Sequence, residues 1–176
     1  MSKTKKNNRS IYLIVLLIVI VGITVYFLRK SGAETELETQ SEALDIPFRK
    51  QGELLFTSQV IGDTLTVIDI EVADNNQLRA RGLMYRRLLP EKAGMLFIQD
   101  MEEMQSFWMK NTYIPLDILF VNRDKEIVTI HANTTPLKEW NYASTEPALY
   151  VVEVNAGFSN RHNIGVGDRI EFIISK

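Results

Sequence analysis

The stretch FWMKNTYIPLDILF, Phe107 to Phe120, sets a few polar residues inside a block of large apolar side chains. Lys110, Asn111 and Thr112 form a short polar group, and Asp117 directly precedes a run of apolar residues. A charged side chain in such surroundings costs stability unless it is paired or serves a function. The block therefore predicts a buried strand after Asp117, with polar neighbours that either brace the fold or form a site.

Short apolar runs separated by turn residues continue on both sides of this block. Leu54 to Ile61 and Leu65 to Val72 flank Gly62-Asp63-Thr64, a pattern that predicts a β-hairpin. The other expected strands are Met95 to Gln99, Gln105 to Met109, Ile118 to Asn122, Glu126 to His131, Tyr150 to Asn155 and Arg169 to Ile174. Many short strands of this kind favour a mainly β fold, either a compact antiparallel sandwich or a small barrel.

Helix signals are few. Asp74, with Gln77 three residues later, resembles an N-cap with its capping-box partner, and Gly82 is placed to end this short helix. Ser159 to Asn163 form a second candidate turn of helix. We therefore expect one or two short helices beside the strands.

The composition limits the classes of function. The chain has 176 residues, 45% of them apolar and 24% charged, which is enough for one globular domain with its own core. It contains no cysteine, so disulfides, thiolate catalysis and thiolate metal sites are excluded. His131 and His162 lie far apart in the sequence and give no metal-binding signature. We expect no cofactor.

The charges are divided unevenly along the chain. Six of the 20 lysines and arginines lie in the first thirty positions, whereas all 22 acidic residues come later. The remaining part therefore carries a formal net charge of minus eight, from fourteen basic and twenty-two acidic groups. Broad nucleic-acid binding needs a surplus of cations, so we expect no nucleic-acid partner.

Ile11 to Leu28 is an uncharged segment of eighteen residues, rich in Ile, Val and Leu. As a helix it is roughly 27 Å long, which nearly matches the hydrocarbon core of a bilayer. Four cations precede it and an acidic stretch follows Lys30, so the positive-inside rule places the N-terminus in the cytoplasm. The segment predicts a single-pass signal anchor, with the lipid bilayer as a partner and the domain in the periplasm or outside the cell.

A cleaved signal peptide is the alternative, since Ser31-Gly32-Ala33 offers a small-residue cleavage site and the domain would then be secreted. The apolar segment is longer than a usual signal peptide and ends at Arg29-Lys30, which favours the anchor. The expected organisation is a basic cytoplasmic tail, a transmembrane anchor, a flexible acidic tether and a β domain, at residues 1–10, 11–28, 29–51 and 52–176.

Three ordered blocks resemble one family. They are RARGLMYRRLLPEKAGMLF (Arg79 to Phe97), FWMKNTYIPLDILF (Phe107 to Phe120) and YVVEVNAGFSNRHNIGVGDRI (Tyr150 to Ile170). Together they are similar to the DUF-192 family, a domain of unknown function found in bacteria and archaea, and the resemblance covers Leu65 to Ile174. It implies a jelly-roll-like β-sandwich and an exported location, and it brings no established reaction or catalytic residue.

Lys110, Asp117 and Glu153 are the candidate catalytic residues. Asp117 and Glu153 lie in apolar strand patterns, so one or both carboxylates are expected to face inward, where Lys110 is available as a partner. In a shared open cleft the two carboxylates could act as general acid and base in a hydrolase of envelope glycans or peptides. A buried ion-pair network that braces the sandwich is the interpretation we favour.

Two further groups of side chains are candidate binding sites. Arg79, Arg81, Arg86 and Arg87 are close in sequence and could grip a phosphate or carboxylate, although a solvated basic face is the commoner role of such clusters. Thioethers bind Cu(I), and Met101-Glu102-Glu103-Met104 offers a pair of them, but this spacing is a weak motif.

The function that the sequence favours is a binding or interaction module of the cell envelope, with an unknown envelope ligand or protein as its partner. Whether it is an enzyme stays open, with the balance against it. The alternatives are the envelope hydrolase that uses Asp117 and Glu153 with Lys110, and a Cu(I)-binding protein that uses methionines.

Overall fold

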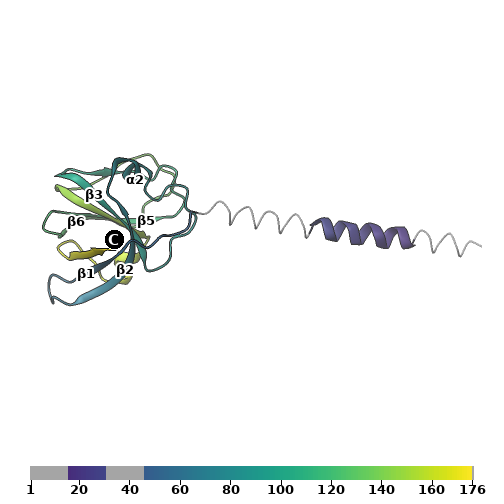
Figure 1. Ribbon diagram of the computed structural model, residues 1–176, viewed down its shortest axis with the longest axis horizontal. Helices are drawn as coiled ribbons and strands as arrows, with labels where there is room; N and C mark the ends of the chain where they lie inside the picture. Colours follow the sequence, from purple (N-terminus) through teal and green to yellow (C-terminus); the bar gives the residue numbers. More distant parts are fainter. Residues whose placement is uncertain (1–15, 31–45, 176) are drawn as a thin grey trace, which may run out of the picture. The chain divides into compact units, whose positions relative to one another are not determined.

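The computed structural model of the chain describes residues 16–30 and 46–175. The chain divides into two compact units, Met1–Leu44 and Asp45–Lys176. In the first unit, residues 16–30 form a continuous helix (Figure 1). The side chains of this helix are exposed. Within the described ranges, no helix has both the length and the apolar character that a membrane span requires. Residues 11–15, where the predicted anchor begins, lie outside those ranges.

The second unit is built around one mixed sheet of seven strands in the order β6-β5-β8-β3-β2-β1-β9. The strands are β1 (Gly52–Thr57), β2 (Thr64–Ala73), β3 (Ala93–Glu103), β5 (Leu116–Val121), β6 (Ile127–His131), β8 (Ala148–Asn155) and β9 (Arg169–Ile174). Two short strands, β4 (Ser106–Phe107) and β7 (Tyr142–Ala143), pair to form a separate small sheet. The mainly β prediction is confirmed.

The sheet is neither a closed barrel nor purely antiparallel. β1 and β2 form the predicted hairpin, but β2 and β3 run parallel, with Ile70 opposite Gly94. This pairing arises because α2 (Asn76–Arg81) intervenes between the two strands, so that the chain can return and run in the same direction. The edges β6 and β9 meet at the isolated bridge between Glu126 and Arg169, without closing the sheet. The prediction of an antiparallel sandwich or barrel is therefore wrong in its finer detail.

The two faces of the sheet carry separate apolar cores. One core contains Leu54, Ile68, Leu119, Val152 and Phe158, together with their buried neighbours. The other contains Leu83, Met95, Phe97, Ile118 and Phe120. Residues 118 to 120 alternate between the two, as side chains of a strand buried on both faces must. A residue's position in its strand therefore decides which core it reaches.

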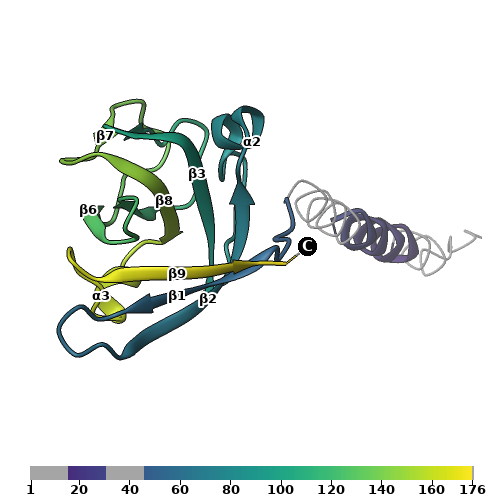
Figure 2. The ribbon, with the colours of Figure 1, turned by 60° about the vertical axis from the view of Figure 1, so that its left-hand side comes forward.

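Two short helices lie at opposite ends of the unit (Figure 2). α2 is next to β3, and α3 (Phe158–Arg161) packs Phe158 against Phe56 of β1, with ring centroids 6.2 Å apart. The N-cap of α2 is Asn75 and not the predicted Asp74, because the Asn75 side chain accepts the Leu78 N–H at 3.0 Å. Gly82 ends the helix with φ 47°, as predicted.

Candidate functional site

Asp117 is fully buried on β5 and is occupied by backbone donors. Its Oδ1 accepts the N–H groups of Asn133 and Gly157 at 2.8 and 2.9 Å, and its Oδ2 accepts that of Ser159 at 2.9 Å. These bonds fasten the start of α3 and a distant loop to the sheet. The expected inward orientation is confirmed, and the carboxylate braces the fold.

The side chain of Lys110 contacts other residues than Asp117. Its Nζ is 3.4 Å from Glu139 and 5.2 Å from the centroid of the Trp108 ring. Asn111, which follows it, has φ 56°, so the chain turns before it reaches β5. The predicted pairing of Lys110 with Asp117 is therefore wrong.

Glu153 and Asp117 lie on opposite faces of the sheet. In the strand register, Asp117 is opposite Val154, whereas Glu153 is opposite Ile118 on one side and Met95 on the other. Neighbouring residues of a strand point to opposite faces, so the sheet separates the two carboxyl groups. The shared cleft that a two-carboxylate hydrolase requires is not formed.

The Glu153 side chain is only 5% exposed, and no hydrogen bond or ion pair reaches its carboxyl group from the described part of the chain. Burial alone raises its pKa from 4.5 to about 8, because the charged form is poorly solvated there. The protonated, neutral form of Glu153 therefore predominates at pH 7. This is the opposite of Asp117, which has three donors.

A cavity of about 280 Å³ lies against Glu153. Its wall comes from α2 and the turn after it, from β3, and from the segment around β4, and it includes Arg81, Met84, Phe97, Gln99, Phe107, Trp108, Thr112 and Glu153. Phe107 packs edge-on against Phe97 and against Phe120, with centroids 5.0 and 5.8 Å apart. Glu153 is the only carboxyl group among the described residues that line this cavity. The arrangement presents one neutral acid beside a firmly packed aromatic wall.

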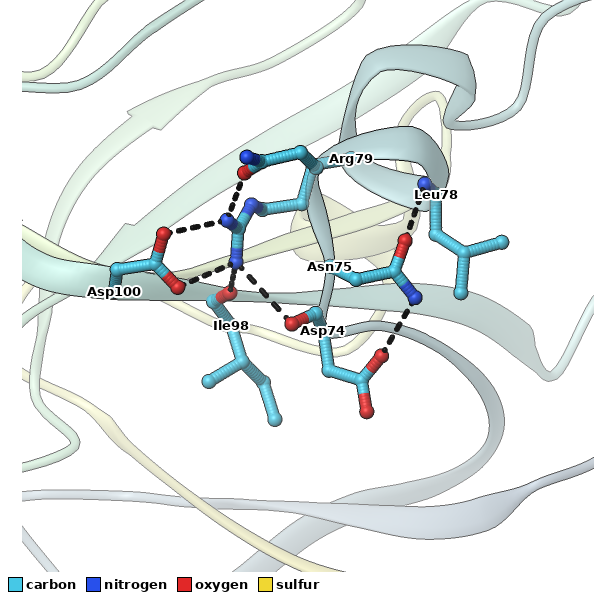
Figure 3. Close-up of polar contacts among 7 residues, drawn as sticks. Asp74, Asn75, Leu78, Arg79, Ile98 and Asp100 are labelled. Carbon is cyan, nitrogen blue, oxygen red and sulfur yellow. Dashed lines mark hydrogen bonds and ion pairs between the residues drawn. The ribbon is translucent and has the colours of Figure 1, made fainter.

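The four candidate anion-binding arginines do not form one cluster. Arg79 lines the cavity, but its guanidinium is held by the Ile98 carbonyl at 2.7 Å and by Asp100 at 2.8 Å (Figure 3). Arg86 forms a buried ion pair with Glu71, and Arg87 lies over the Tyr113 ring, 5.5 Å from its centroid. Arg81 is exposed at the cavity, and no hydrogen bond or ion pair occupies its side chain within the described ranges.

Comparison with known proteins confirms the resemblance in the sequence. The model of the DUF192 family, described as an uncharacterized ACR, matches residues 57–172. The chain belongs to the DUF192 family. A UPF0127 protein of Pyrococcus furiosus is 31% identical over 108 residues, which cover 60% of this chain and 87% of the relative. A second UPF0127 protein, from Pyrococcus abyssi, is 31% identical over 110 residues, covering 59% of this chain and 86% of the relative.

Two solved structures share the fold of this DUF192 domain. One, from Sinorhizobium meliloti 1021 and described as a candidate transcription regulator, has a TM-score of 0.66 and 40% identity, and the match covers 73% of this chain and 97% of that one. The other, a protein of unknown function from Novosphingobium aromaticivorans, has a TM-score of 0.64 and 36% identity, with 68% and 83% covered.

The methionines of the DUF192 domain differ in burial. Met95 and Met109 are buried in the core, as the apolar sequence around them indicates. Met101 and Met104, the weak Cu(I) candidates, are 64% and 58% exposed at the end of β3 and just beyond it. Across the described ranges, histidine and carboxylate side chains form no cluster of three that would complete a metal site near them.

Sequence reasoning identified Glu153 but missed its cavity. The strand parity that Glu153 shares with Leu149 and Val151 was the signal that it is buried. The cavity wall is drawn from residues 79–84 and 105–112, which come together only when the sheet and α2 are assembled. No local pattern shows that these segments leave a space beside Glu153.

Proposed function

We propose that the domain is a binding module for a small molecule and that its site is the cavity beside Glu153. The observation that carries this proposal is a buried carboxyl group in the wall of a cavity, with no partner among the residues that the structure describes. An ionisable group in such a place lowers stability, and groups of this kind concentrate at functional sites. Cavities that combine apolar walls with a few polar groups are the usual form of small-molecule sites.

The wall indicates the chemistry of the ligand. A protonated Glu153 offers one O–H donor and one acceptor, while the Phe107 and Trp108 rings offer flat apolar surfaces. The ligand that suits this wall has a planar or apolar group and a carbonyl, amide or similar acceptor that reaches Glu153. Arg81, at the same cavity, favours a ligand that is neutral or anionic over a cation.

Fragment binding to the full-length protein tests the proposal. Saturation-transfer NMR with a set of small planar amides and acids should give ligands whose signal is lost in Trp108→Ala. Trp140→Ala is the matched control, because Trp140 is similarly exposed, at 53% against 46%, and is not among the residues lining the cavity. Glu153→Gln keeps a donor and an acceptor and should retain binding, whereas Glu153→Leu should lose it. Equal loss in Trp108→Ala and Trp140→Ala would contradict the proposal.

We also propose that residues 11–28 anchor this module in the cytoplasmic membrane, with the domain in the periplasm or outside the cell. The uncharged apolar sequence of this segment, its basic flank and the helix over residues 16–30 support the proposal. The chain should stay in the membrane fraction after an alkaline wash. A shortened, soluble product would instead favour cleavage and secretion.

The role described for the Sinorhizobium protein is not the one proposed for this chain. The part of the chain after Lys30 carries fourteen basic and twenty-two acidic groups, a balance that opposes binding to phosphate backbones. A binding module of the cell envelope agrees better with this charge.

A further inference from the structure

A second cavity, of about 380 Å³, shares Arg81 and Gly82 with the cavity beside Glu153. Its charged wall consists of three arginines, Arg49, Arg81 and Arg86, and one acid, Glu71. The rest of the wall is largely apolar and includes Pro47, Val72, Leu78 and Met95. The described wall thus carries two more positive than negative charges beside apolar surface.

Glu71 and Arg86 form the buried part of this cavity. They are 5% and 6% exposed, and Arg86 Nη2 donates to Glu71 Oε2. The other oxygen, Oε1, accepts the backbone N–H of Arg49 at 2.7 Å, which fixes Arg49 beside the ion pair. Both oxygens of Glu71 are therefore engaged, and Arg86 Nη1 is buried without a hydrogen-bond partner within the described ranges.

The side chains of Arg49 and Arg81 are exposed, and no hydrogen bond or ion pair to either guanidinium occurs among the described residues. Elsewhere in the domain, Lys50 pairs with Glu53 and Asp69, and Arg161 pairs with Glu91. Among the described residues, the cavity therefore holds two guanidinium groups, those of Arg49 and Arg81, that no acid pairs with.

We propose that this cavity is a second binding site, for a small organic anion with an apolar body. Guanidinium groups pair with carboxylates and phosphates in a two-pronged geometry, so Arg49 and Arg81 would hold the charged end. Pro47, Leu78 and Met95 would cover the apolar body. The buried pair of Glu71 and Arg86 positions this wall and keeps Glu71 from neutralising Arg49 and Arg81.

The site is tested by calorimetric titration of the full-length protein with hexanoate, hexyl phosphate and inorganic phosphate at constant ionic strength. We expect saturable binding of at least one alkyl anion, and much weaker binding of inorganic phosphate, which lacks the apolar body. The preferred head group, carboxylate or phosphate, follows from which alkyl probe binds more tightly. Absence of saturable binding of both alkyl anions, or equal affinity for inorganic phosphate, would overturn the proposal.

Three matched variants locate the binding. Arg49→Gln and Arg81→Gln should each lower the affinity for the alkyl anion by about tenfold. This is the effect expected from the loss of one charge-assisted hydrogen bond. Lys92→Gln removes an exposed cation that does not line the cavity and should leave the affinity unchanged. If Lys92→Gln lowered the affinity for the alkyl anion as much as the two arginine variants do, general charge attraction would explain the binding. That result would refute the site. Trp108→Ala, which alters only the cavity beside Glu153, should also leave the affinity unchanged, so the two proposals can fail separately.

Discussion

Replacing Glu153 by glutamine should remove much of the loss of stability that the protein undergoes between about pH 5 and pH 8. Burial raises the pKa of Glu153 from 4.5 to about 8 in the folded protein. Between these two values the unfolded chain has released a proton that the folded chain retains. Unfolding therefore becomes easier as the pH rises, and the stabilisation present below 4.5 is lost by about pH 8.

The magnitude follows from this pKa difference. Each pH unit inside the window corresponds to about 1.4 kcal/mol of unfolding free energy. Raising the pH from about 5 to about 7.5 should therefore cost the wild type about 3 kcal/mol through Glu153, a large part of the stability of an ordinary domain. The glutamine side chain of the Glu153→Gln variant cannot ionise, so this variant should show no such loss. The difference in slope is the useful quantity, because a buried amide changes stability by a similar amount at every pH.

Urea unfolding of the full-length protein, followed by tryptophan fluorescence at several pH values, measures this slope. The two proteins differ only at position 153, so contributions from all other groups cancel in the comparison. Glu171→Gln, which removes an exposed glutamate of β9, should follow the wild type. If the free-energy difference between wild type and Glu153→Gln stayed constant from pH 5 to pH 8, Glu153 would not be a neutral buried acid, and the argument for the cavity would lose its basis.

Three further predictions concern the stability of the fold, and urea unfolding of the variants tests each of them. Asp117→Ala removes the acceptor of three backbone N–H groups and should lower the free energy of unfolding by at least about 3 kcal/mol. A decrease below about 1 kcal/mol would show that water replaces the carboxylate as the acceptor. Arg86→Met leaves the Glu71 carboxylate buried without its ion-pair partner and should cost about 3 to 5 kcal/mol. The double variant Glu71→Leu/Arg86→Met should recover much of this loss. No recovery would mean that the loss comes from packing alone. Gly94→Ala places a Cβ 2.7 Å from the Glu153 carbonyl oxygen and should be severely destabilised, whereas Gly165→Ala, whose nearest contact is 3.9 Å away, should be close to neutral.

Local sequence patterns predicted the strands better than their arrangement. The last strand, Arg169–Ile174, has the predicted bounds, and Tyr150 to Asn155 is the larger part of β8. These runs are recognisable because turn residues delimit them and because apolar residues occupy every second position. The parallel pairing of β2 with β3 was not predicted, because strand order is set by contacts between distant parts of the chain. The helix between these strands has only six residues, so its sequence signal for a crossover connection is weak.

The same distinction separates what the sequence could say about Asp117 and Glu153. Each stands among apolar residues of a buried strand, and on this basis one or both were expected to face inward, as both do. Their partners could not be predicted, because the donors to Asp117 lie 16, 40 and 42 positions along the chain. Register also places the two groups on opposite faces, although each was a reasonable partner for the other in sequence.

The two carboxyl groups thus have nearly equal burial and opposite surroundings, and this contrast is the physical reason for giving them different roles. The fold supplies Asp117 with three donors, so its charge is compensated and its removal should be felt as lost stability. Within the described ranges it supplies Glu153 with none and instead leaves a cavity beside it. A strand core made only of apolar residues would be more stable at neutral pH than one that contains Glu153. The stability that this residue costs is accounted for if its carboxyl group binds a molecule that enters the cavity.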